Sequence, residues 1–174
     1  MNPSKSYPLS LPRVEGPVFV LNKEHLQQGL EASRESPRKR IMLPMHRTTT
    51  EGVQRMVNYL QRDSYIKPHQ HPMPECVENL AVLQGAMGVL SFDEEGNVLE
   101  AHRLVAGDAS SCMIDIEQGV WHTLVPLADD TVILEIKRGP YDAKTDKAFA
   151  KWAPDEGTPE SLAWLNRIIA THFA

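Results

Sequence analysis

The sequence is poor in cysteine. Only Cys76 and Cys112 occur among 174 residues, and neither belongs to a Cys-x-x-Cys pair. Two such cysteines do not make a disulfide framework, and the missing pair argues against a zinc–thiolate site. We expect two reduced thiols in a cytoplasmic protein.

Basic charge and long apolar runs are also lacking. Eighteen Lys and Arg residues against 23 Asp and Glu residues give a formal net charge of −5, so the chain has no basic footprint for nucleic acid. No apolar run reaches the length of about 20 residues that spans a membrane. Pro8 and Pro12 break the N-terminal segment before it reaches signal-peptide length. We expect neither a nucleic acid nor a membrane as a partner.

The overall composition, with 41% hydrophobic and 24% charged residues, is typical of a folded globular protein. The length predicts one domain. We expect it in three parts. Residues 1–62 form an N-terminal lead-in with helices, residues 63–142 a barrel, and residues 143–174 a C-terminal extension with a helix.

Three segments predict helix. Leu26 and Leu30 lie four residues apart within Lys23–Ser36, and Thr158 followed by Pro159 is a helix start before an apolar stripe. The third segment is Glu51–Gln61. A capping box precedes it, and four apolar residues have helical spacing. They are Val53, Met56, Val57 and Leu60.

Short β-rich runs predict strands elsewhere. Pro17–Leu21 is a possible edge strand, and Ile41–His46 is a short extended segment. From Ser64 to Arg138, seven or eight short runs alternate with turns such as Asp93–Asn97 and Gly107–Asp108. No helical pattern separates these runs, which excludes a parallel βαβ sheet and predicts an antiparallel sandwich or barrel.

A group of histidines carries the chemistry of the sequence. His69 and His71 point to the same face of an extended segment and can each reach one ion at about 2.1 Å. His122 follows a turn at Gly119 and can project from a neighbouring strand into the same interior. Three histidines with one carboxylate suit Fe, Mn, Ni, Zn or Co.

These residues resemble a known family. The runs H-x-H, E-x6-G (Glu78 to Gly85) and G-x-x-H (ending at His122) are similar to the two motifs of the cupins. Glu117 stands at a usual proline position and Pro126 at a frequent asparagine position, and neither departure touches a ligand. The resemblance implies an all-β core, a double-stranded β-helix or jelly-roll barrel, with α-helices flanking it at both ends.

The flanks extend the resemblance over roughly residues 41–157. The runs "MHRTTTEGVQRMVNYLQRDSYIKPHQHP", "LEIKRGPY" and "DKAFAKWAPDEG" resemble the WbuC-type cupin-fold metalloproteins, which occur among bacterial polysaccharide clusters and elsewhere. This likeness implies a fold and a metal without naming a reaction. Because cupins often pair, it also makes a homodimer an expectation.

Two spacing rules disagree about the glutamate ligand. Three residues separate His71 from Glu75, which matches the common cupin spacing, whereas the count back from Gly85 favours Glu78. Glu75 follows two prolines and should lie in a loop, while Glu78 should begin an alternating strand. We therefore predict Glu78 as the ligand and keep Glu75 as the alternative.

Three further residues are candidates for catalysis. Glu135 and Lys137 share a strand face that points either into the barrel or into solvent, and Tyr141 could close over the mouth. Elsewhere we expect Trp121 to pack away from the metal and Cys112 to be a small core residue.

A divalent ion held by these ligands keeps open coordination positions. We expect a small-molecule substrate, such as a sugar or sugar derivative, and isomerisation, epimerisation or oxygenation as the reaction. The alternatives are a binding or sensing module without turnover and a barrel whose metal is purely structural.

Overall fold

The computed structural model describes residues 7–108 and 110–174, and within them ten strands form two antiparallel five-stranded sheets. The first sheet contains, in spatial order, β1 (Arg40–Pro44), β2 (Val53–Leu60), β9 (Thr131–Arg138), β4 (Glu78–Gln84) and β7 (Met113–Ile116). The second contains β10 (Ala148–Phe149), β3 (His69–Gln70), β8 (Trp121–Pro126), β5 (Ala86–Phe92) and β6 (Val98–Val105).

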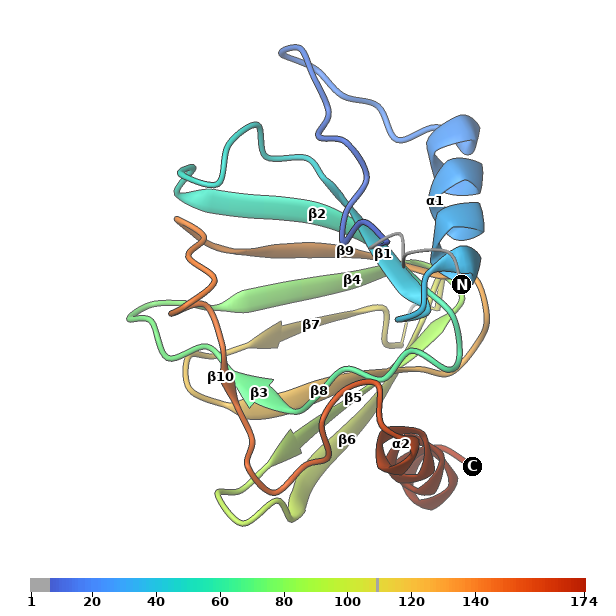
Figure 1. The fold of residues 1–174 in the computed structure, drawn as a ribbon, viewed down its shortest axis with the longest axis vertical. Helices are drawn as coiled ribbons and strands as arrows, with labels where there is room; N and C mark the ends of the chain where they lie inside the picture. The colour runs from blue at the N-terminus through green and yellow to red at the C-terminus, as the bar shows by residue number, and fades with distance from the viewer. Residues whose placement is uncertain (1–6, 109) are drawn as a thin grey trace, which may run out of the picture.

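The two sheets face each other, with a helix on the outer side of each (Figure 1). Apolar side chains from both sheets fill part of the space between them. They include Leu60, Leu80, Val82, Met87, Val89, Leu104, Ile116, Leu124 and Ile133. This is the all-β jelly-roll core with flanking helices that the sequence predicts.

The second helix, α2 (Pro159–His172), covers the second sheet. The Thr158 side chain caps it by accepting from the Ser161 amide, as the sequence predicts. Leu165 and Ile168 pack on the outward side chains of β5 and β8. β5 is therefore buried on both faces, because its alternate residues fill the barrel interior.

The first helix, α1 (Lys23–Glu35), covers the first sheet and confirms the predicted helix at Lys23–Ser36. It lies directly on Tyr59 of β2. A Cβ atom added at Gly29 would lie 2.3 Å from the Tyr59 ring, so only glycine fits this approach. Leu26 and Leu30 complete the contact with the outer face of β1 and β2.

The helix predicted at Glu51–Gln61 is wrong, because this segment forms β2. One face of β2, including Met56 and Leu60, lies toward the barrel interior, while Val57 and Tyr59 lie under α1. Burial on both faces produces apolar residues at helical spacing in a strand. β1 and β2 thus both belong to the first sheet.

Two smaller expectations are also wrong. Pro17–Leu21 forms no strand, and the bridge between Ser10 and Met42 lies along β1 instead. Cys112 is exposed, because it lies in a bend just before the edge strand β7. Trp121 packs beside Trp152 and on the α2 side of the second sheet, as expected. Neither α1 nor α2 combines the length and apolar character that a membrane crossing requires.

Candidate metal centre

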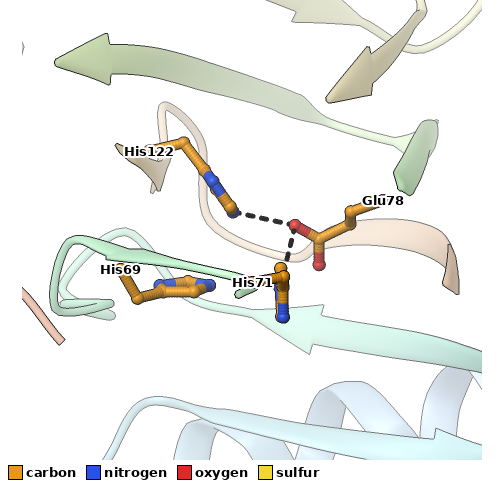
Figure 2. A group of neighbouring side chains, drawn as sticks. All are labelled: His69, His71, Glu78 and His122. Atoms are coloured by element: carbon orange, nitrogen blue, oxygen red, sulfur yellow. Dashed lines mark hydrogen bonds and ion pairs between the residues drawn. The ribbon is translucent and has the colours of Figure 1, made fainter. Parts of the chain in front are cut away.

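Four side chains from both sheets meet inside the barrel. His69 lies on β3 directly opposite His122 on β8, and His71 follows β3 by one residue. Glu78 is the first residue of β4 in the facing sheet. All four side chains are buried and point toward one another (Figure 2).

The possible ligand atoms of these residues lie within 4.8 Å of one another. The Oε2 atom of Glu78 lies 2.9 Å from Nε2 of His122 and 3.7 Å from Nε2 of His71, as the dashed lines in Figure 2 show. Two ligands on opposite sides of one ion are at most about 4.2 Å apart. The cluster is therefore close to the dimensions of a single ion site.

Backbone carbonyls orient all three imidazole rings. The Nδ1 atom of His69 lies 3.0 Å from the Lys67 carbonyl, that of His71 lies 2.6 Å from the Asp146 carbonyl, and that of His122 lies 2.8 Å from the Val120 carbonyl. A carbonyl only accepts, so each Nδ1–H donates. Each Nε2 atom therefore points to the centre, the arrangement that second-shell contacts impose on metal-binding histidines.

Two of these Nε2 atoms test whether a metal fits. Those of His69 and His71 are buried and have no hydrogen-bond partner in the part of the chain described. Buried polar atoms are almost always paired, so two such atoms aimed at one point indicate a missing partner. Imidazole nitrogens with one carboxylate are suitable donors for a first-row divalent ion. The residues present fit such an ion.

The electrostatics of the cluster agree with this fit. Burial acts to raise the pKa of Glu78, but the neighbouring His122 and His71 side chains outweigh it and hold this pKa well below its usual range. Burial lowers the pKa of His69 well below that of a free histidine. Glu78 is therefore ionised and His69 neutral, the forms in which both residues bind metals.

The structure separates the two candidate glutamates. Glu78 is 2% exposed and lies among the histidines. The Glu75 side chain is 85% exposed and pairs with Arg138 at 3.0 Å. Glu75 also has a left-handed φ of 56° in the loop before β4. The geometry thus brings Glu78, and not Glu75, to the histidines.

A cavity of about 510 Å³ adjoins the cluster, and both His69 and Glu78 line it. The candidates Glu135 and Lys137 on β9 are buried and line it too, so their strand face points inward. Tyr141 is 44% exposed and also lines the cavity, with its ring centroid 5.9 Å from Nζ of Lys137. The structure therefore places all three candidates beside the proposed metal ligands.

Glu135 and Lys137 have protein partners. Nζ of Lys137 donates to both carboxylate oxygens of Asp146, at 2.8 and 2.7 Å, and Nδ2 of Asn58 donates to Oε2 of Glu135 at 2.8 Å. Burial and the nearby charge of Glu78 raise the pKa of Glu135. Burial acts to lower the pKa of Lys137, but the carboxylates of Glu135 and Asp146 outweigh it and raise this pKa.

Three residues in this arrangement were missed from the sequence: Asn58, Asp146 and Lys147. Asn58 lies on the strand that was predicted as a helix. Asp146 and Lys147 belong to the segment after β9, whose sequence carries no metal or catalytic motif. Only the return of this segment to β3, where Phe149 pairs with His69, places them at the cavity.

Comparison with known proteins gives a fold and no activity. A family model described as a domain of unknown function, DUF6016, matches residues 21–104. No curated protein matches the chain.

Solved structures of low sequence identity resemble this chain. An oxalate oxidase studied for its mechanism is 11% identical in sequence, with a TM-score of 0.50. The match covers 80% of this chain and 75% of the oxidase chain. The chain has a cupin fold. KdgF from Halomonas sp. is 22% identical in sequence, with a TM-score of 0.47. The match covers 63% of this chain and 86% of the KdgF chain.

A second oxalate oxidase, recombinant and in complex with glycolate, is 13% identical with a TM-score of 0.49. It covers 66% of this chain, and this chain spans 57% of its length. At such identities the likeness concerns the fold alone.

Proposed function

We propose that His69, His71, His122 and Glu78 hold one divalent transition metal, which is Fe, Mn, Ni or Zn. We propose further that the loaded protein acts on a small oxygenated molecule, a sugar or sugar derivative, bound in the adjoining cavity. The observation that carries this proposal is the pair of buried, unpartnered Nε2 atoms aimed at the ionised Glu78 carboxylate.

Three neutral imidazoles and one carboxylate leave a divalent ion with a net charge near +1 and open positions. Bound there, such an ion polarises a carbonyl or enediol oxygen, lowers the pKa of bound water, or binds O2 in the case of Fe(II). The ligand set alone does not choose among isomerase, epimerase and dioxygenase activity.

The chain itself supplies groups that can move a proton. Glu135 has a raised pKa beside the cavity, which suits a carboxyl group that takes and returns a proton. The Lys137 ammonium can donate to an oxygen of the substrate, and Tyr141 can cover the mouth. These groups favour isomerisation or epimerisation, in which a proton leaves and returns next to a carbonyl.

Turnover tests this proposal. Metal-loaded and chelated protein would be mixed with nucleotide sugars and small diols, while O2 uptake and products are followed. We expect conversion of at least one compound by the loaded protein and none after chelation. O2 uptake would assign an oxygenase, and its absence during conversion an isomerase or epimerase. Conversion that survives complete metal removal would overturn the proposal.

A second candidate function is ligand binding or sensing without turnover. The observation that favours it is that Lys137 and Glu135 are already held by Asp146 and Asn58. Groups engaged in this way hold a ligand well but move protons less freely. Tight, metal-dependent binding of one compound in the same panel without any conversion would support this candidate.

We also propose that the chain is a WbuC-type cupin, which its sequence flanks support. A cytoplasmic location and a homodimer stay predictions, as do the boundaries of the three parts of the chain. Size-exclusion chromatography with light scattering would test the dimer.

A further inference from the structure

Within the described part of the chain, the segment between β9 and β10 carries an ammonium group at the cavity that has no hydrogen-bond or ion-pair partner. Lys147 is half-buried and lines the cavity together with His69 and Glu78. Among the residues that the structure describes, its Nζ atom takes part in no hydrogen bond or ion pair. The adjacent carboxylate of Asp146 is not available, because both of its oxygens accept from Lys137.

The other cationic side chains of the cavity wall differ from Lys147. Arg38 and Arg40 share the Glu156 carboxylate, each at 2.7 Å, and Lys67 pairs with Asp155 at 2.7 Å. Arg13 is exposed and therefore hydrated. Withdrawing a charged group from water without a counter-ion is unfavourable, and a bound anion can offset this cost in free energy.

The charge around the site favours a singly charged anion. Two ammonium groups, Lys137 and Lys147, face three carboxylates, Glu78, Glu135 and Asp146. When all five groups are ionised they carry one net negative charge, which a divalent ion would change to one net positive charge. A monoanionic carboxylate balances that charge, whereas a phosphate dianion exceeds it.

Phe149 adds an apolar surface beside Lys147. The two residues are separated by one position, so they share a face of the extended chain, and both line the cavity. The Phe149 side chain is 55% exposed, and its ring centroid lies 6.1 Å from that of His69. An ammonium group and an aromatic face next to the proposed metal ligands suit a short carbon chain that ends in a carboxylate.

We propose that Lys147 binds the carboxylate of the small molecule whose remaining oxygens lie at the four-residue metal centre. The substrate or ligand is then a hydroxylated carboxylic acid of the sugar-acid kind. This inference rests on the proposed function, because it places the ligand beside the metal.

The experiment compares three probes that differ only at one terminal carbon: D-glycerate with a carboxylate, glycerol with an uncharged hydroxymethyl group, and glycerol 3-phosphate with a phosphorylated one. Their dissociation constants would be measured by calorimetry on the metal-loaded full chain and on Lys147→Gln, Lys147→Arg and Lys144→Gln. Lys144 is exposed on the same segment, so its variant matches the charge change away from the cavity. Elemental analysis and a thermal melt of each variant would establish that metal and fold are retained.

We expect glycerate to bind more tightly than the other two probes. Lys147→Gln should weaken glycerate binding about ten-fold or more, since a hydrogen bond between two charged groups is lost. Lys147→Arg should retain part of the affinity, and Lys144→Gln should retain all of it. Metal content should stay unchanged in all three variants.

Three results would overturn the inference: equal glycerate affinity in Lys147→Gln, tighter binding of the phosphate, or no glycerate binding by the unaltered protein. Failure of the proposed function looks different, because the unaltered protein would then hold no metal. If chelated protein still bound glycerate through Lys147, the result would support Lys147 as the carboxylate-binding residue. It would contradict the proposal that the metal helps to bind the ligand.

Discussion

The two walls of the cavity differ in whether their buried polar groups are paired with other protein groups. On the wall formed by β3 and β8, His69 and His71 each present a buried Nε2 atom that has no hydrogen-bond partner among the described residues. On the wall formed by β9 and the segment after it, Lys137 is paired with Asp146 and Glu135 with Asn58. Both walls are similarly buried, so burial alone does not explain the difference.

The difference indicates which polar groups serve the fold and which await a ligand. Paired groups at full burial contribute to stability or rigidity, whereas unpaired ones cost free energy unless something binds them. On this view the histidine wall is prepared for a cation. On the β9 wall the buried polar groups described above are already paired with other protein groups, and Lys147 is the exception. Substitutions on the two walls should therefore affect different measured quantities.

The largest stability effect should come from the β9 wall. Asp146→Ala would remove the closest ion-pair partner of the 4% exposed Lys137 side chain and leave only the Glu135 carboxylate, at 3.9 Å. We expect the free energy of unfolding to fall by up to about 3–5 kcal/mol, the usual cost of removing one partner of a buried ion pair. Urea titration monitored by circular dichroism would measure it.

A matched control and a double variant sharpen that prediction. Asp155→Ala also removes an ion pair, but the Asp155 side chain is 82% exposed. Its effect should stay below about 1 kcal/mol. Adding Lys137→Met to Asp146→Ala should recover much of the loss. Equal effects of Asp146→Ala and Asp155→Ala would show that the β9 wall does not depend on its buried pair.

A destabilising change outside the cavity should leave metal binding intact. In Gly29→Ala the new Cβ would meet the Tyr59 ring at 2.3 Å. We expect a loss of about 1–3 kcal/mol from overpacking, which exceeds the helix propensity gained. Gly52→Ala, where no atom lies within 4 Å, is the control. Metal content that fell with stability in Gly29→Ala would undermine the separation of the two properties.

A smaller effect is expected from Asn58→Ala, which removes the hydrogen bond to Glu135. The loss should be about 1–2 kcal/mol, since the acceptor is a buried carboxyl group. Asn79→Ala removes a comparable bond to Asp115 on the exposed side and should change stability by less than about 0.5 kcal/mol. Chemical denaturation of both variants would check this, and indistinguishable losses would count against a structural role for Asn58.

The smallest effect should depend on pH. Burial acts to raise the pKa of Glu156, but the charges of Arg40 and Arg38 outweigh it and lower this pKa from its usual 4.5. A carboxyl group with a depressed pKa in the folded state stabilises above its unfolded pKa and loses that effect as pH falls through the folded value. Glu156→Gln should therefore cost up to about 1 kcal/mol at pH 7.

That cost should shrink below pH 4.5 and vanish in stronger acid, where Glu156 is protonated in both folded and unfolded protein. Melting temperatures of Glu156→Gln and unaltered protein between pH 3 and pH 7 would measure this. A difference that stayed constant across the range would show that the Glu156 charge is not its source.

Sequence patterns predicted the barrel because turn residues and alternation recur along residues 64–138. They failed at β2, where Val53, Met56, Val57 and Leu60 have helical spacing. A strand between a barrel interior and a covering helix is buried on both sides, so its apolar residues need not alternate. Periodicity alone could not separate this strand from a helix.

The candidate site was predictable where its residues are close in sequence or follow a motif. His69, His71 and His122 came from spacing, and Glu78 from its place at the start of an alternating strand. The Asn58–Glu135 bond spans 77 positions and arises from the register of β2 on β9. No local pattern carries such a register, so the β9 wall was accessible only from the structure.

One pair of variants tests whether His69, His71, Glu78 and His122 hold a metal. Unaltered protein, Glu78→Ala and Glu75→Ala would be purified without added metal and submitted to elemental analysis. We predict about one ion per chain in the unaltered protein and in Glu75→Ala, and little or none in Glu78→Ala. Full metal content in Glu78→Ala, or its loss in Glu75→Ala alone, would contradict the account.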